Sequence, residues 1–140
     1  MQYKQYENLV FIRLDEGEDL IESIKKICRE LRTSAAVIIS GLGQLQKVKI
    51  GYYREKDNYT PMEYKERFEL LSMTGTIIKH DNEYKPHLHV VLGREDKKTV
   101  GGHLLGGTIG VTGEIILQLS RIEIKRKYNP GTGLQEMTFI

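Results

Sequence analysis

The sequence contains no tryptophan, a single cysteine, three prolines and no long run of apolar residues. A membrane-spanning helix needs roughly 18 to 20 consecutive apolar residues, so neither such a helix nor a membrane partner is expected. Residues 1–20 are interrupted by charge and lack the apolar core and small-residue cleavage site of a signal peptide. A cytoplasmic location is therefore predicted.

The lone cysteine, Cys28, limits the sulfur chemistry that the chain can perform. One cysteine cannot form an internal disulfide or supply a thiolate metal cluster within one chain. Cys28 falls on the apolar side of a predicted helix. The favoured interpretation is a small buried hydrophobic residue, and the alternative is a reactive thiol.

Neither sign of charge is in large excess. The 21 basic and 19 acidic residues give a net charge of +2, which is too balanced for a protein that grips nucleic acid mainly by covering phosphates with positive charge. The 39% hydrophobic and 29% charged residues exclude a disordered tail. A length of 140 residues suits one domain, predicted to span residues 1–140.

The periodicity of apolar residues predicts one helix and seven or eight strands. The helix covers residues 19–32, where apolar residues recur at three- and four-residue steps. The predicted strands cover residues 8–14, 35–40, 44–53, 67–78, 87–93, a segment after Lys98, 114–128 with a bend near 118–120, and 136–140. Residues 54–66 contain Pro61 and are predicted as a loop or an edge strand. These elements predict an α+β fold with a mainly antiparallel sheet or open barrel, and with the helix packed on it.

Two glycine-rich segments and one basic segment are candidate binding motifs. SGLG at residues 40–43 and GGTIG at residues 106–110 do not continue into a helix, as phosphate-binding motifs do, so tight turns are predicted. RIEIKRKY at residues 121–128 alternates apolar and polar residues, which favours an exposed strand over a nucleic-acid patch.

Three of the four histidines lie between residues 86 and 107. Side chains alternate between the faces of a strand, so His87 and His89 are predicted to share one face while Leu88 points into the core. A hairpin loop centred on Asp96 would place His103 opposite His89, and directly opposed residues share a face. This register requires an odd number of loop residues, or a bulge at Gly101–Gly102.

Three converging imidazoles predict a site for a divalent metal, most simply zinc, with a fourth position open to water or substrate. The alternative is three histidines that make ordinary hydrogen bonds at the surface or in the core. Glu114 was considered as a fourth ligand, against the alternative of a solvated charge at a strand end. His80, in a polar turn, is predicted to be only solvated.

Four segments resemble the plants-and-prokaryotes-conserved (PPC) domain family: SAAVIISGLGQLQKVKIGYY, RFELLSMTGTI, HLHVVLGRED and VGGHLLGGTIG. The resemblance covers nearly the whole chain. It implies an α+β fold with a mainly antiparallel sheet, assembled as a homotrimer. Stand-alone prokaryotic members keep the HxH and GGH histidines, so the resemblance also implies a metal site at His87, His89 and His103.

Plant members of the family carry the domain after AT-hook motifs in nuclear DNA-binding proteins. There the segment that corresponds to residues 67–72 is associated with interactions between proteins. This sequence has no Arg-Gly-Arg core of an AT-hook, so the resemblance does not extend to minor-groove binding.

The combined prediction is a small homotrimeric PPC-domain protein that binds a divalent metal and acts as a binding or regulatory module, with DNA as a weak partner. The competing hypothesis is a hydrolase-like enzyme that uses a metal-activated water, with Glu114 or a neighbour as base. No catalytic residue is assigned. A third hypothesis is a scaffold in which the histidines only pack the trimer.

Overall fold

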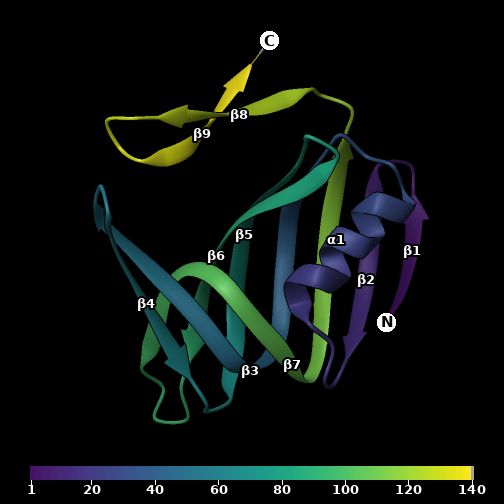
Figure 1. Cartoon of the computed structure of the whole chain (residues 1–140). Helices are drawn as coiled ribbons and strands as arrows, with labels where there is room; N and C mark the ends of the chain where they lie inside the picture. The colour runs from purple at the N-terminus through teal and green to yellow at the C-terminus, as the bar shows by residue number, and fades with distance from the viewer. Residues whose placement is uncertain (140) are drawn as a thin grey trace.

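The computed structural model describes residues 1–139 and shows a strongly curved antiparallel sheet with one helix packed against it (Figure 1). The elements in chain order are β1 (Gln2–Tyr6), β2 (Leu9–Asp15), α1 (Leu20–Glu30), β3 (Ala35–Glu55), β4 (Asn58–Tyr64), β5 (Phe68–His80), β6 (Glu83–Gly93), β7 (Thr99–Ser120), β8 (Ile124–Asn129) and β9 (Leu134–Phe139). The predicted antiparallel sheet and helix are therefore confirmed. No helix within residues 1–139 has the length and apolar character needed to cross a bilayer.

Seven strands form one sheet in the order β1-β2-β7-β6-β5-β3-β4. Every pairing in it is antiparallel. β3 also pairs with β7, so β3, β5, β6 and β7 form a closed ring of paired strands. This ring makes the sheet barrel-like, and its interior is filled by fully buried side chains that include Phe68, Leu88 and Ile109.

α1 begins at its capping residue Asp19, whose carboxylate accepts a hydrogen bond from the Glu22 backbone N–H at 2.9 Å. Its buried side chains lie in the same core cluster as the inward-facing residues of β2. The buried residues of α1 are Leu20, Ile24, Ile27 and Cys28. Burial raises the pKa of the Cys28 thiol to about 12, so the favoured interpretation as a buried hydrophobic residue agrees with the structure.

The prediction of tight turns at the two glycine-rich segments is wrong. Residues 40–43 lie inside β3 and residues 106–110 lie inside β7, so both strands are much longer than expected. Gly43 has a φ of +139°, and an added Cβ there would overlap the Thr112 carbonyl oxygen of β7. Gly43 therefore lies where the backbones of β3 and β7 approach closely at a β-bulge, and it does not mark a turn.

The segment predicted as one bent strand over residues 114–128 is two strands. β7 ends at Ser120, and its side-chain hydroxyl accepts a hydrogen bond from the Ile122 backbone N–H at 3.1 Å, which replaces the sheet pairing locally. β8 begins at Ile124 and pairs with β9 in a separate two-stranded sheet. Figure 1 shows this hairpin lying across one end of the barrel, near the ends of β5 and β6.

The two edge strands of the sheet are β4 and β1, and only β4 lies in a segment for which an edge strand was one of the predictions. Residues 54–66 contain the edge strand β4, in which Pro61 lies opposite Gly51, so the edge alternative is the correct one. β1 was not predicted. The expected closing strand over residues 136–140 is β9, which begins at Leu134, and Ile140 lies outside the described residues.

Candidate metal centre

The β6–β7 hairpin brings the three histidines of the HxH and GGH segments together. Leu88 is buried in the core, whereas His87 and His89 project from the outer face of β6. His89 pairs directly with His103, and Gly93 pairs with Thr99. The loop over residues 94–98 has an odd length centred on Asp96, so the predicted register is confirmed without a bulge at Gly101–Gly102.

The three rings face one another at short range. The ring centroids of His87 and His89 are 5.2 Å apart, those of His87 and His103 are 5.2 Å apart, and those of His89 and His103 are 5.5 Å apart. One ring nitrogen from each residue lies within 4.8 Å of the other two. The Nε2 atoms of His87 and His89 are 3.2 Å apart, close to the ~3.3 Å that two nitrogens span on a tetrahedral zinc ion.

Partial burial lowers the pKa of two imidazoles of the cluster, His87 and His103. Desolvation, followed by the neighbouring imidazoles, lowers the pKa of His103 below its ordinary value. Desolvation also lowers the pKa of His87, with further contributions from His89 and Arg126. Both rings are therefore neutral at pH 7, with a nitrogen lone pair free to bind a cation.

Tyr59 of β4 forms the wall next to His103, and sequence reasoning missed it. The two rings meet edge to face, with centroids 6.3 Å apart and planes at 83°. Gly51 lies opposite His103 in β3, and an added Cβ there would overlap the Tyr59 ring. Gly51 thus leaves space for the aromatic ring that supports the imidazole.

The three histidines open onto a cavity of about 1040 Å³. The same cavity is lined by residues of β3, β4, β7, the end of β5, the β5–β6 turn and the β8–β9 hairpin, among them Tyr53, His80, Asp81, Leu105, Arg126, Leu134 and Gln135. His80 is therefore not merely solvated, as the prediction held. Its Nδ1 accepts a hydrogen bond from the Arg126 backbone N–H at 3.5 Å, and its Nε2 lies 3.3 Å from the Asp81 carboxylate.

Arg126 is the second residue of this cavity that sequence reasoning missed. It is half-buried, whereas its neighbours Lys125 and Lys127 are exposed. It lies in phase with Ile124 along β8, so the two-residue alternation of a strand places it on the side that faces the barrel. That phase was the available signal, but the prediction for the basic segment was an exposed strand, with no binding role for Arg126.

Glu114 does not join the histidines, which corrects the suggestion of a fourth ligand. It lies eleven positions after His103 in β7 and pairs with Leu42 of β3 and Arg13 of β2. The group of side chains able to share one metal ion within residues 1–139 consists of the three histidines alone. The prediction failed because it placed a turn between His103 and Glu114. Both residues lie in the same strand, β7, which continues without interruption from Thr99 to Ser120.

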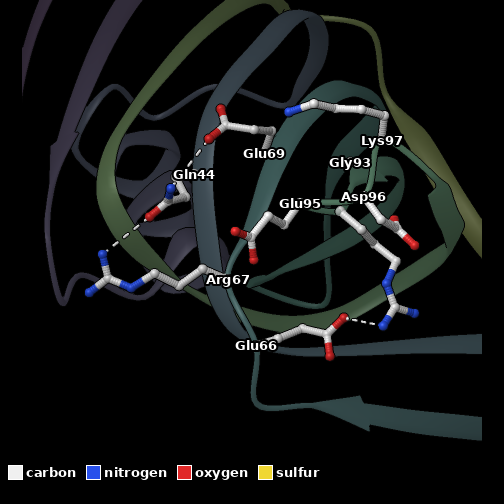
Figure 2. Close-up of a pocket in the computed structure, with 9 residues that line it drawn as sticks. Gln44, Glu66, Arg67, Glu69, Gly93, Glu95, Asp96 and Lys97 are labelled. Carbon is white, nitrogen blue, oxygen red and sulfur yellow. Dashed lines mark hydrogen bonds and ion pairs between the residues drawn. The ribbon is translucent and has the colours of Figure 1, made fainter.

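A second cavity, of about 780 Å³, lies beside the β6–β7 loop and is lined mainly by charged residues (Figure 2). These residues largely satisfy one another. Arg67 lies 3.0 Å from the Glu16 carboxylate and donates to Gln44 at 3.3 Å, and Arg94 lies 2.9 Å from Glu66. Because both of its arginines are already paired with carboxylates, this cavity is a weaker candidate for a binding site than the histidine cavity.

The fold and the histidine cluster together define a class: a barrel-like antiparallel domain that presents three imidazoles from one β-hairpin. Residues 1–120 match the model of the Plants and Prokaryotes Conserved (PCC, also written PPC) domain, and the chain belongs to this family. The β8–β9 hairpin, with Arg126, lies beyond the matched residues.

Several solved structures share the fold over almost the whole chain. A PPC protein from Pyrococcus horikoshii is 32% identical, with a TM-score of 0.82 over 99% of this chain and 96% of that chain. A metal-containing protein from Archaeoglobus fulgidus is 30% identical, with a TM-score of 0.84 over 98% of this chain and 96% of that chain. A "putative dna binding protein" from Bacteroides thetaiotaomicron is 25% identical, with a TM-score of 0.92 over 99% of this chain and 96% of that chain.

The chain is also similar to part of a much longer protein. It is 28% identical over 128 residues to the bifunctional protein GlmU of Synechococcus sp. (strain JA-3-3Ab), which covers 90% of this chain and 20% of that protein. The chain thus spans about a fifth of the length of the curated relatives it matches.

Proposed function

We propose that the chain is a binding or regulatory module that holds one divalent metal ion, zinc, through His87, His89 and His103. The observation that carries this proposal is the meeting of one ring nitrogen from each of the three histidines within 4.8 Å of one another. A metal-containing relative of the same fold supports it. In this proposal residues 1–140 act as one domain in the cytoplasm. Elemental analysis of protein purified without an affinity tag is expected to find one zinc per chain.

The chemistry of the donor set favours zinc over the hard cations. Magnesium and calcium prefer oxygen ligands, whereas imidazole nitrogens suit zinc, copper, iron and nickel. Three protein nitrogens with one further position are a common zinc arrangement, in which the bound ion acts as a Lewis acid. The chain's own contribution is to hold the rings: the rigid hairpin fixes His89 against His103, and Tyr59 supports His103 from the side.

A metal-dependent enzyme is the competing hypothesis, and one observation favours it. The histidines open onto a cavity of about 1040 Å³, which is large enough to admit a substrate. The proposed base, Glu114, is remote from them. Among the described residues that line the cavity, Asp81 is the only carboxylate, and it is exposed and paired with His80. The binding module is therefore the better-supported function.

We further propose that the chain assembles as a homotrimer, as the family resemblance implies. Phe11 of β2 is 53% exposed, and Val37 and Leu42 of β3 are 42% and 49% exposed. Their pairings with β7 place all three on the same outer face of the sheet. A cluster of exposed apolar side chains on one sheet face is typical of an interaction surface.

Leu42→Asp is expected to convert the trimer into monomers, because a charge would be buried at the contact between chains. Light scattering coupled to size-exclusion chromatography measures this as a fall from the mass of three chains to that of one chain of 16.1 kDa. Ile122→Asp is the matched control, since Ile122 is also 49% exposed but lies in the segment between β7 and β8. A monomeric wild-type chain, or an unchanged trimer in Leu42→Asp, would contradict the proposal.

Association with DNA is proposed only as a weak interaction, supported by the printed description of the relative from Bacteroides thetaiotaomicron. With a net charge of +2, few phosphates can be neutralised at once. Affinity for a fluorescently labelled duplex, measured by anisotropy, is expected to fall roughly ten-fold or more between about 50 and 200 mM salt. A flat response to salt, or no binding at the lower concentration, would count against DNA as a partner.

A further inference from the structure

The histidine cavity carries an excess of positive charge that the three imidazoles do not explain. Its charged lining residues are Asp81, Lys85 and Arg126. Lys85 is paired with Glu83, and Asp81 is paired with His80. Arg126 has a different environment: among residues 1–139, its guanidinium donates to the Gln135 carbonyl oxygen at 3.4 Å and to no other side chain or backbone oxygen.

Arg126 is also partly withdrawn from water. Burial lowers the pKa of its guanidinium, and no carboxylate within residues 1–139 offsets that effect. Its side chain lines the same cavity as the three histidines, so its charge faces the space onto which they open. A half-buried arginine next to a cation site is unfavourable unless an anion is bound between the two charges.

We propose that the cavity binds a small organic anion, whose carboxylate or phosphate group bridges the Arg126 guanidinium and the metal held by the three histidines. This proposal rests on the metal site proposed above. A planar guanidinium presents paired N–H donors that match the two oxygens of a carboxylate or phosphate. Neutral imidazoles leave the full charge of a divalent ion uncompensated, so an anionic oxygen is the complementary ligand.

The rest of the cavity wall indicates the chemical character of the non-anionic part of this ligand. Its wall includes the aromatic rings of Tyr52, Tyr53 and Tyr59 together with Leu105 and Leu134. Tyr52 and Leu134 are 70% and 41% exposed, so they offer apolar surface to a bound molecule. A volume of about 1040 Å³ is in the range of small-molecule sites. The ligand class is therefore a small carboxylate or phosphate with an apolar or aromatic body.

The test uses benzoate and phenyl phosphate, which present the same ring with either anionic group. Each is titrated by calorimetry into zinc-loaded wild-type protein and into the Arg126→Gln and Arg126→Lys variants. Arg126→Gln is expected to weaken binding of the preferred probe about ten-fold or more, which is the effect of losing a charge-assisted hydrogen bond. The affinity of Arg126→Lys is expected to lie between those of the wild type and Arg126→Gln. An ammonium keeps the positive charge but lacks the paired N–H donors of a guanidinium.

Arg121→Gln is the matched control, because Arg121 is exposed, lies outside β8 and does not line the cavity. It removes the same charge and is expected to leave both affinities unchanged. Thermal unfolding of each variant checks that the hairpin remains folded. Equal binding by wild-type protein and Arg126→Gln, or no binding of either probe to the zinc-loaded wild type at millimolar concentration, would overturn the proposal.

A zinc titration without any anion separates this inference from the function on which it rests. Zinc affinity is expected to be the same or slightly higher in Arg126→Gln than in the wild type, since a nearby positive charge has been removed. Failure of the wild-type chain to bind zinc would overturn the metal site and the bridge together. Normal zinc binding with no effect of Arg126 on either probe would overturn the anion site alone.

Discussion

His89→Ala is expected to abolish stoichiometric zinc binding, because it removes one of the three imidazoles that meet at the site. His89 is paired with His103 across the hairpin, and its Nε2 lies 3.2 Å from that of His87. Loss of one of three ligands should cost more than the roughly 10- to 100-fold in affinity that follows loss of an outer-shell partner. Elemental analysis of tag-free protein should find one zinc per chain in the wild type and almost none in the variant.

His80→Ala is the matched control for this prediction. His80 lines the same cavity and has a similar ring, but it lies outside the group of three histidines. The variant should retain full zinc content, which would show that the loss in His89→Ala is not a general effect of removing an imidazole. Equal zinc content in the wild type and His89→Ala would remove His89 from the site.

The geometry of the histidine cluster was predictable because it depends only on local rules. Strand alternation places His87 and His89 on one face, and an odd loop length places His103 opposite His89. None of these steps requires knowledge of distant contacts. The helix was predictable for the same reason, since its apolar period and the Asp19 cap lie within one short segment.

The errors arose where tertiary contacts decide the local structure. Glycine at position 43 is compatible with a turn or with a strand that passes close to another, and only the Thr112 carbonyl of β7 distinguishes the two. Glu114 was wrongly expected near the histidines because β7 is longer than predicted and carries Glu114 away from them.

The rest of the cavity could not be assembled from the sequence because its walls come from distant segments. Tyr59 reaches His103 only through pairing of β4 with β3 and of β3 with β7. Arg126 reaches the cavity because the β8–β9 hairpin folds back over the ends of β5 and β6, where its backbone N–H meets His80. The Tyr59 contact leaves no periodic signal in the chain, and the phase of Arg126 with Ile124 indicates only which side of β8 it lies on, not what it faces.

Gly75→Ala is expected to destabilise the fold and to weaken zinc binding through the same displacement. Gly75 of β5 lies opposite Leu88 and has a φ of +135°, where a side chain is strained. An added Cβ would overlap the His87 carbonyl oxygen, so β6 must move away from β5 at the residue that carries the first imidazole.

The strain and the overlap together should lower the free energy of unfolding by about 3 kcal/mol or more, measured by denaturant titration of the metal-free protein. Gly106→Ala is the matched control in β7, because its φ is not in the left-handed region and an added Cβ there would meet nothing within 4 Å. It should change the free energy of unfolding by less than about 1 kcal/mol and leave zinc affinity intact.

If Gly75→Ala were as stable as Gly106→Ala, the close pairing of β5 and β6 at Gly75 could not be what fixes His87. If it were unstable but bound zinc with full affinity, the position of His87 would depend on the β6–β7 hairpin alone.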